Sequence, residues 1–195
     1  ILFLDLDETL IHSDINSKYE RTDAIITLPL DDGASSFGIM IRPYVSEFLQ
    51  YTSETFNVVL FTAGIKSYAD AIVDYLDPEK KYFSLRLYRD SCIQFNNFYI
   101  KDLSIIPGYS EKDLIILDNC IFSFAVNLRN AILISSYYSD VNDRELLNVT
   151  DYLDDKLVNS IDVRDINEGF FGFETIRNYL YDKLIQEGII AAVES

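Results

Sequence analysis

The sequence predicts an α/β fold with a central parallel sheet, and three observations point to this class. Short apolar runs, several of them rich in β-branched residues, recur along the chain at the length of buried strands. Segments with apolar residues at helical spacing lie between several of these runs. The runs end abruptly in acidic or polar residues, as buried parallel strands do at the edge of a sheet. Strands that alternate with helices form a parallel sheet, and ligands bind at the carboxyl ends of its strands.

The chain opens with a buried strand and a hairpin. Residues 1–4 (ILFL) form the expected strand, since the run is apolar and stops at an acidic residue. Residues 24–30 and 36–42 are rich in β-forming residues and flank a glycine-containing turn at 31–33. We therefore expect them to pair as a β-hairpin.

A helix, a strand and a second helix follow. Pro43 is expected to open a helix over about 44–55, because proline is favoured in a first turn and apolar residues then recur at helical spacing. Residues 58–61 (VVLF) predict a second buried strand. A helix is expected after it, with Tyr68, Ile72 and Leu76 on one face.

The second half of the chain continues the alternation. The expected strands lie at 84–88, 98–101, 114–117 and 131–134, with the first two around a polar turn at Asn96-Asn97. Helices are expected from Asp143 onward and over 173–187, because leucine and isoleucine recur there at helical spacing.

Composition limits the possible partners. The chain has 195 residues, of which 49% are hydrophobic, so it is a folded domain rather than a disordered segment. Its net charge of -16 repels nucleic acid and anionic lipid. No apolar run approaches the roughly 18 residues of a membrane span. The two cysteines are too few for a disulfide framework, which favours an intracellular location, nuclear or cytoplasmic. Nothing in the sequence indicates an oligomeric state.

Polar residues at the ends of the expected strands form a chemically coherent set. The set contains Asp5, Asp7, Thr62, Lys101, Asp118 and Asn119. Two carboxylates at positions i and i+2 of an extended segment project to the same side and resist joint ionisation, so the pKa of one tends to rise. One carboxylate can attack while the other carries a proton, which is the chemistry of phosphoryl transfer through a carboxylate nucleophile.

The same set supplies ligands for a metal ion and for phosphate. Hard oxygen ligands from Asp5, Asp118 and Asn119 suit Mg²⁺, while Thr62 and Lys101 would hold the remaining phosphate oxygens. The alternative is a packed α/β domain whose strand ends happen to be acidic. Residues suited to the same chemistry follow four different strands, which makes a chance arrangement the weaker alternative.

Five segments also resemble one family. They are DLDETLIHS at 5–13, IRPYVSEFLQ at 41–50, VLFTAG at 59–64, YIKDLS at 99–104 and ILDN at 116–119. Together they resemble the FCP/SCP-type (NLI-interacting-factor-like) C-terminal-domain phosphatases of the haloacid dehalogenase superfamily. The resemblance implies a Rossmann-like haloacid dehalogenase fold with a small β-hairpin insert. It implies a phosphatase domain over 1–157 with inserts near 12–42 and 84–100, and leaves 158–195 as a helical extension packed on or flanking that domain.

The resemblance also implies a role for each residue of the site. Asp5 corresponds to the nucleophile that becomes an aspartyl-phosphate, and Asp7 to the general acid and base. The implied phosphate ligands are Thr62, Lys101 and Arg89. The implied Mg²⁺ site is formed by Asp5, Asp7 through its backbone carbonyl, Asn119, and Asp118 through a metal-bound water, unless Asp118 instead bonds to Lys101.

A phosphorylated protein or peptide is the implied substrate. The family resemblance suggests a Ser-Pro phosphopeptide such as the C-terminal tail repeats of RNA polymerase II. The positions that match the family's proline pocket are Ile15, Ile65 and Tyr68.

The sequence departs from the family at three places, one of which is extra length around Pro107-Gly108-Tyr109 between Lys101 and Asp118. Cys120-Ile121 follows Asp118-Asn119 where the family has Ser-Pro, so this loop loses a stiffening proline. The segment 94–98 lacks the basic and glycine residues common in the family, which points to a shifted substrate preference. We expect Cys120 to be a buried structural thiol, and His12 to orient a loop rather than to catalyse.

Three other functions compete with a protein phosphatase. A small-molecule phosphatase of the same superfamily usually closes its site with a large cap, for which the insert before residue 58 has little room. A non-catalytic binding module of the same fold, as in a mitochondrial translocase receptor, tends to lose an acidic residue of the first motif, whereas Asp5 and Asp7 are both present. A two-component receiver domain places its phosphoacceptor on a central strand after an acidic pair, which does not fit DLDETL.

Overall fold

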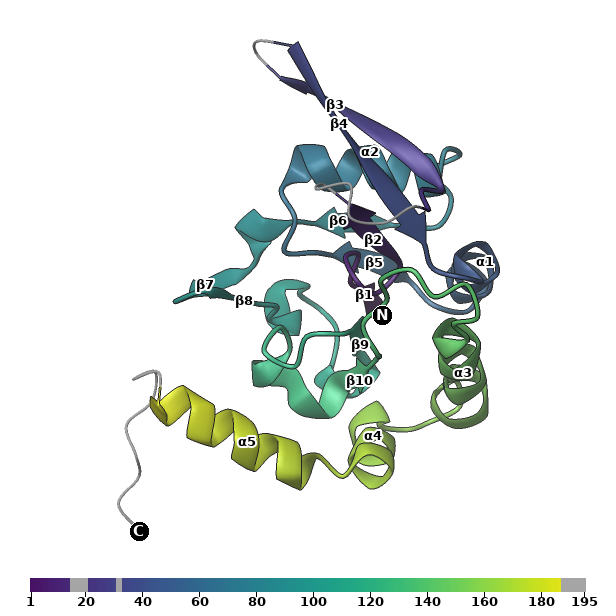
Figure 1. Ribbon diagram of the computed structural model, residues 1–195. Coiled ribbons are helices and arrows are strands. Elements are labelled where there is room, and N and C mark those ends of the chain that lie inside the picture. Colours follow the sequence, from purple (N-terminus) through teal and green to yellow (C-terminus); the bar gives the residue numbers. More distant parts are fainter. Residues whose placement is uncertain (15–20, 31–32, 187–195) are drawn as a thin grey trace.

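A five-stranded parallel sheet forms the centre of the computed structural model (Figure 1), which describes residues 1–14, 21–30 and 33–186. Its strand order is β10-β9-β1-β5-β6, so β1 has β9 on one side and β5 on the other. Phe3 of β1 lies opposite Val59 and Ile116 in the two neighbours. The strands are β1 (Leu2–Leu4), β5 (Val58–Phe61), β6 (Leu85–Leu87), β9 (Ile115–Asp118) and β10 (Ala131–Leu133). The predicted α/β class with a central parallel sheet is confirmed.

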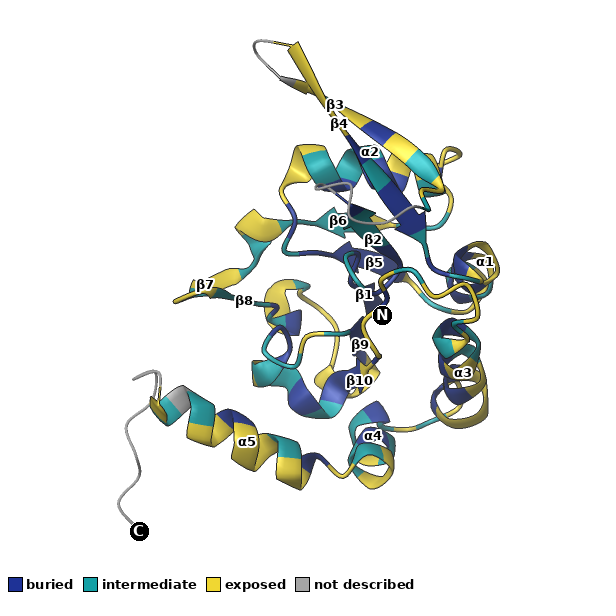
Figure 2. Cartoon of the chain, in the orientation of Figure 1, coloured by how far each residue is buried: buried dark blue, intermediate teal, exposed yellow. Residues whose placement is uncertain are grey.

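Two hydrophobic cores cover the two faces of this sheet (Figure 2). Because side chains alternate along a strand, Leu2 and Leu4 point into one core and Phe3 into the other. The core of Leu2 and Leu4 is covered by α1 (Val45–Thr55), α2 (Lys66–Leu76) and α3 (Glu145–Tyr152). The core of Phe3 is covered by the 3-10 segment η4 (Ala125–Asn130) and by α5 (Phe173–Gln186). A π-helical turn, η5 (Leu153–Leu157), continues α3.

A second, antiparallel sheet is inserted between β1 and α1. It contains β2 (Ile11–Asp14), β4 (Gly33–Ile41) and β3 (Ala24–Leu30), in that order across the sheet. The predicted hairpin is confirmed, and its two strands extend away from the central sheet as a long ribbon (Figure 1). The sequence analysis missed β2, because its residues are mostly polar and carry no apolar alternation. The residues at 31–32, in the predicted turn, lie outside the described part of the chain.

The predicted pairing of residues 84–88 with 98–101 is wrong. Residues 85–87 instead join the central sheet as β6, parallel to β5. The partner of β8 (Phe98–Ile100) is β7 (Ile93–Phe95), and Asn96 makes the tight turn between them with φ 48°. The turn at Asn96-Asn97 was predicted correctly, but the strand that leads into it is β7 rather than the expected strand at 84–88. The remaining 3-10 segments are η1 (Arg89–Ser91), η2 (Leu103–Ile105) and η3 (Glu111–Asp113).

Residues after α3 pack onto the domain through a helix that the sequence analysis missed. This helix, α4 (Val163–Phe171), begins at Asp162, whose side chain accepts a hydrogen bond from the backbone of Arg164. It ends at Gly172, whose φ of 59° suits glycine. Asn167 is buried, accepts a hydrogen bond of 2.8 Å from the Tyr152 hydroxyl and donates to a backbone carbonyl of η4. None of the described helices is long and apolar enough to cross a membrane.

Candidate active site

The carboxyl ends of β1, β5 and β9 border one cavity. Strands β5 and β6 lie on one side of β1, and strands β9 and β10 lie on the other side. The strand order therefore reverses at β1, and ligands bind at such a position in an open α/β sheet. The cavity has a volume of about 380 Å³. Its lining includes the residues predicted from the strand ends: Asp5, Asp7, Thr62, Lys101, Asp118 and Asn119.

A buried ion network occupies the floor of this cavity. The Nζ atom of Lys101 lies 2.6 Å from a carboxylate oxygen of Asp5 and 2.6 Å from one of Asp118. Only 1% of the Lys101 side chain is exposed. Burial by itself would lower the pKa of Lys101, but the two carboxylates raise it above its ordinary value, so the amine stays charged. Burial raises the pKa of Asp118, an effect that the Lys101 ammonium opposes.

A threonine hydroxyl connects Asp5 to Asn119. The hydroxyl of Thr9 donates to Oδ2 of Asp5 at 3.0 Å and lies 3.5 Å from Oδ1 of Asn119. The amide nitrogen of Asn119 donates to the Ser136 hydroxyl at 2.9 Å, which turns Oδ1 of Asn119 toward Asp5. Thr9 and Ser136 were not among the predicted site residues, because nothing in their spacing distinguishes them.

This donor set fits a hard divalent cation. Oxygens of Asp5 and Asn119 both approach the Thr9 hydroxyl, so these two oxygens lie close together. Among the residues that the structure describes, no three carboxylate, histidine or cysteine side chains converge as metal ligands. A carboxylate and an amide oxygen are ligands that suit a hard divalent cation such as Mg²⁺, which keeps several of its waters.

Asp7 is held by a tyrosine from α2. The hydroxyl of Tyr68 donates to Oδ1 of Asp7 and contacts the hydroxyl of Ser13. Burial raises the pKa of Asp7 to about 7; the hydrogen bond from Tyr68 lowers it, and the nearby Asp5 raises it. Burial and the Asp7 carboxylate raise the pKa of Tyr68, so its hydroxyl stays protonated and donates. The sequence analysis placed Tyr68 in a substrate pocket and missed its contact with Asp7.

Thr62 follows β5 directly and is hydrogen-bonded to a glycine two residues later. Its buried hydroxyl accepts a hydrogen bond of 2.9 Å from the backbone N–H of Gly64. A Cβ atom on Gly64 would lie 3.1 Å from the Tyr68 ring and 3.2 Å from the Thr62 hydroxyl. A larger residue at position 64 would therefore press on two side chains of the site.

Arg89 lies beside the catalytic cavity rather than in it. Its Nε donates to the backbone carbonyl of Ala63 at 2.6 Å, and its guanidinium lies 5.0 Å from the centre of the Tyr99 ring. Arg89 lines a neighbouring cavity of about 420 Å³ that also includes Asp7. The guanidinium thus lies at the rim of the site.

That neighbouring cavity contains two of the three predicted pocket residues. Ile65 and Tyr68 line it, and Leu28 of β3 adds an apolar contact that the sequence analysis missed. The third predicted residue, Ile15, lies outside the described residues. The cavity shares Asp7 and Glu8 with the catalytic cavity, so the two are adjacent.

Aromatic side chains form part of the wall of the catalytic cavity. Phe98 of β8 and Phe122, which follows β9, stack with their ring centres 4.3 Å apart and an interplanar angle of 25°. Both line the cavity, together with Tyr99. The sequence analysis noted the unusual composition of residues 94–98 but not that it builds this wall.

The expected burial of Cys120 is wrong, because Cys120 is exposed. It lies two residues after the end of β9. The backbone N–H of Cys120 donates to Asp118 at 2.7 Å, and this bond holds the loop in place of the missing proline. His12 lies 2.8 Å from the Glu8 carboxylate, an arrangement that orients the loop after β1.

A buried arginine supports the loop that carries Thr9. Arg42 is 1% exposed and donates to the backbone carbonyls of Thr9 and Ser135 at 3.0 and 2.8 Å. It is neutralised by Asp143, with an N–O distance of 2.8 Å. These bonds fix the backbone next to both Thr9 and Ser136.

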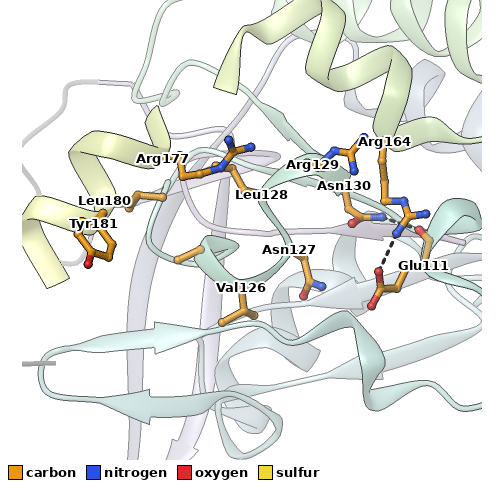
Figure 3. Close-up of a pocket in the computed structure, with 11 residues that line it drawn as sticks. Glu111, Val126, Asn127, Leu128, Arg129, Asn130, Arg164, Arg177, Leu180 and Tyr181 are labelled. Atoms are coloured by element: carbon orange, nitrogen blue, oxygen red, sulfur yellow. Dashed lines mark hydrogen bonds and ion pairs between the residues drawn. The ribbon is translucent and has the colours of Figure 1, made fainter. Parts of the chain in front are cut away.

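A third cavity lies between η4 and α5 (Figure 3), and none of the predicted catalytic residues lines it. Three arginines border it, and each is paired with an acid. Arg164 lies 2.8 Å from Glu111, Arg129 lies 2.8 Å from Asp165, and Arg177 lies 3.4 Å from Glu168. We assign these pairs to the packing of the C-terminal helices.

The fold and this site define an α/β domain with an acidic cleft at the switch point of its sheet. The family model of the NLI interacting factor-like phosphatases matches residues 1–164. The chain therefore belongs to the NLI interacting factor-like phosphatase family.

Named relatives agree with this membership. Phosphatase PSR1 of Saccharomyces cerevisiae is 42% identical over 167 residues, which are 85% of this chain and 38% of the relative. The probable C-terminal domain small phosphatase of Dictyostelium discoideum is 39% identical, over 84% of this chain and 52% of the relative. The human carboxy-terminal domain RNA polymerase II polypeptide A small phosphatase 2 is 38% identical, over 75% of this chain and 53% of the relative. The chain thus spans about half the length, or less, of these relatives.

Solved structures share the fold. A structure of the fission yeast RNA polymerase II CTD phosphatase Fcp1 bound to beryllium fluoride superposes with a TM-score of 0.58 at 18% identity, over 96% of this chain and 66% of that chain. Another structure of Fcp1 gives a TM-score of 0.59 at 17% identity, with the same coverage. These similarities confirm the predicted fold.

Proposed function

We propose that this chain is a Mg²⁺-dependent phosphatase that removes phosphate from phosphoserine and phosphothreonine in proteins. The observation that carries the proposal is the meeting of Asp5, Asp7, Thr62 and Lys101 in one cavity. Membership of a phosphatase family supports the same reaction.

In the first step an oxygen of Asp5 attacks the phosphorus atom. The bond between phosphorus and the serine oxygen breaks, and Asp7 gives its proton to that oxygen as it leaves. The raised pKa of Asp7, about 7, supports this role, because a carboxyl group that keeps its proton near neutral pH can act as an acid. The product of the step is an aspartyl-phosphate on Asp5.

In the second step a water molecule attacks the same phosphorus atom. Asp7, now without its proton, takes one from the water, and the bond from phosphorus to Asp5 breaks. Inorganic phosphate leaves and the starting carboxylate returns. The hydrogen bond from Tyr68 orients Asp7 for both transfers.

Several groups bind the phosphate oxygens or neutralise their negative charge. We assign Lys101 and Thr62 to its oxygens, and Arg89 to the substrate at the rim. Asp118 keeps Lys101 in place through the 2.6 Å ion pair. Mg²⁺ would be held by Asp5, Asn119 and the backbone carbonyl of Asp7, with Asp118 bound through water, and it would neutralise the charge that develops on the phosphate.

A Ser-Pro phosphopeptide is the proposed substrate, as in the C-terminal domain of RNA polymerase II. The apolar cavity beside Asp7, lined by Ile65 and Tyr68, supports a place for the proline ring. Ile15 belongs to the same proposal through its sequence position. We propose a nuclear or cytoplasmic location, a reducing environment that suits a chain with two free cysteines.

The size of the inserts supports a protein substrate over a small metabolite. The insert before α1 is a three-stranded sheet, and the later insert is the single hairpin β7–β8. Neither has the size of a cap domain. A purely binding role is disfavoured, because both acidic residues of the first motif face the cavity.

Replacing the two carboxylates tests the mechanism. Asp5→Asn and Asp7→Asn should each lower kcat on a phosphopeptide by about a thousandfold or more, because the uncatalysed reaction is extremely slow. Asp151→Asn, an exposed aspartate on α3, is the matched control and should leave kcat unchanged. Wild-type turnover in both active-site variants would refute the proposed function.

A further inference from the structure

A fourth cavity lies beside the catalytic cavity and carries a different balance of charge. It has a volume of about 460 Å³, and the charged side chains among the described residues that line it are Lys66, Arg89 and Asp90. The catalytic cavity, in contrast, is lined by four acidic side chains and one lysine. In a chain with a net charge of -16, a cavity with two cations and one anion is suited to an anionic ligand.

One turn of backbone connects the fourth cavity to the catalytic cavity. The turn is Thr62-Ala63-Gly64, and its first two residues line the catalytic cavity. Arg89 is bonded to the same turn, because its Nε donates to the carbonyl of Ala63 at 2.6 Å and its backbone N–H donates to that of Gly64 at 3.0 Å. Tyr99 lines both cavities. The two cavities are therefore adjacent, and one extended peptide can reach both.

The guanidinium of Arg89 is held in place but keeps donors for a ligand. Its Nε is bonded to Ala63, and its centre lies 5.0 Å from the centre of the Tyr99 ring. The two Nη atoms make no hydrogen bond to any residue that the structure describes, and the side chain is exposed. A guanidinium with such donors can bind a phosphate through two parallel hydrogen bonds.

Lys66 can exchange its present partner for a ligand. Its Nζ lies 2.6 Å from Asp70 and 4.5 Å from the centre of the Tyr88 ring. The lysine side chain is 67% exposed, and an ion pair in water contributes little to stability. Asp70 would keep other partners, because it also accepts hydrogen bonds from Arg86 at 2.9 Å and from the Tyr88 hydroxyl at 2.7 Å. The ammonium group is therefore available to the cavity that it lines.

We propose that Lys66 and Arg89 bind a second phosphate group of the substrate, so that the protein favours peptides phosphorylated at two nearby residues. The inference rests on the proposed function, because the first phosphate must occupy the catalytic cavity. A phosphate suits the two cations better than a carboxylate, because it carries about two negative charges at pH 7 and offers three acceptor oxygens.

The position of the fourth cavity allows the second phosphate to lie before or after the phosphoserine. The cavity adjoins the catalytic cavity through Tyr99, and it shares Ile65 and Arg89 with the cavity of Ile65 and Tyr68. An extended peptide advances about 3.3 Å per residue, so we expect the second phosphate within about three residues of the first.

Peptide kinetics test the second phosphate site. The peptides carry one phosphoserine and, in turn at each position within three residues of it except that of the proline, a non-hydrolysable phosphonate, a glutamate or an alanine. In at least one position the phosphonate should raise kcat/KM about tenfold over alanine, with glutamate between them. The gain should lie in KM, because the second group binds equally in the ground state and the transition state. It should shrink as the salt concentration rises.

Variants that change the charge of the fourth cavity should act in opposite directions. Lys66→Gln and Arg89→Gln should each reduce the gain from the phosphonate to less than about threefold. Lys66→Gln should leave kcat/KM for the alanine peptide unchanged. Asp90→Asn should increase the gain, because it removes the anion that lines the same cavity.

The chain offers a matched control for Lys66. Lys81 is also exposed, paired with an acid and placed over a tyrosine ring, with its Nζ 3.4 Å from Glu79 and 5.0 Å from the centre of the Tyr82 ring. It does not line the fourth cavity, so Lys81→Gln should leave the tenfold gain intact. An equal loss of the gain in Lys66→Gln and Lys81→Gln would show a general attraction rather than a site, and would overturn the proposal.

A binding measurement separates this inference from the phosphatase proposal. Fluorescence anisotropy with the Asp5→Asn variant should give about tenfold tighter binding of the phosphonate peptide than of the alanine peptide without any turnover. Equal kcat/KM for phosphonate, glutamate and alanine at every position in an active wild-type enzyme would overturn the second phosphate site and leave the phosphatase standing. Absence of hydrolysis together with the binding preference would overturn the phosphatase and leave the second phosphate site standing.

Discussion

The hydroxyl of Tyr68 donates a hydrogen bond to the carboxylate of Asp7, so a residue of the proposed proline pocket also touches the proposed acid. The Tyr68 side chain therefore contributes both to the proposed substrate pocket and to the orientation of the proposed acid. A variant that removes the whole ring tests both at once, whereas removal of the hydroxyl alone tests the second.

Tyr68→Phe should lower kcat by about tenfold and preserve the preference for Ser-Pro peptides. The ring stays in the pocket, but Asp7 loses a charge-assisted hydrogen bond that orients it. This bond lowers the pKa of Asp7, so its loss should move the corresponding inflection in the pH profile of kcat/KM to higher pH. Tyr75→Phe, an exposed tyrosine of the same helix, serves as the control. An unchanged kcat and an unchanged profile would contradict the role of the hydroxyl.

Lys101→Met should destabilise the protein by about 3–5 kcal/mol, because it leaves the buried carboxylates of Asp5 and Asp118 without their shared cation. Urea unfolding measures the change in the free energy of unfolding. The exposed Lys112 provides the comparison, and Lys112→Met should change that free energy by no more than about 0.5 kcal/mol. A loss of less than about 1 kcal/mol in Lys101→Met would show that the network contributes little to stability.

Asn119→Ala should raise the Mg²⁺ concentration needed for half-maximal activity by about 10–100-fold, and chelation should silence the wild type. Ser136→Ala should give a smaller increase, since Ser136 only orients the amide of Asn119. The exposed Ser110, whose side chain makes no capping bond, is the control through Ser110→Ala. Full activity of the wild type after exhaustive chelation would rule out the metal.

The two thiols should react at very different rates with iodoacetamide. Burial raises the pKa of Cys92 to about 11, so only about one molecule in a thousand carries the thiolate there at pH 8. Cys120 is exposed and should be alkylated first. At any pH below 11, raising the pH by one unit should speed the labelling of Cys92 about tenfold. Peptide mass spectrometry measures the labelling rate of each cysteine. Equal labelling rates in the folded protein would contradict this order, and equal rates after unfolding are the control.

The sequence was sufficient to predict the central sheet and the cluster at its edge. The runs at 1–4, 58–61 and 114–117 are apolar throughout, which is the pattern of strands buried on both faces. Parallel strands bring their carboxyl ends to one edge, so Asp5, Thr62 and Asn119 meet as a consequence of topology.

Contacts that depend on tertiary packing were beyond the sequence. The hydrogen bond from Tyr68 to Asp7 joins residues 61 positions apart, and their spacing carries no signal of it. The stack of Phe98 on Phe122 likewise depends on how the β7–β8 hairpin folds against the loop after β9. Strand β2 was missed because its polar residues are stabilised by pairing with β4 rather than by their own pattern.

The position of β1 in the middle of the sheet has a consequence for folding during synthesis. The ribosome makes β1 before either of its neighbours, yet both β5 and β9 must pair with it. Leu2, Phe3 and Leu4, which are fully buried in the finished protein, can pair with β5 once residue 61 has emerged, but they gain their second neighbour, β9, only after residue 118. Contacts over such a separation close slowly, and exposed strand edges favour aggregation in the interval. The nascent chain thus carries one unpaired edge of β1 until β9 joins it and the catalytic edge of the sheet is complete.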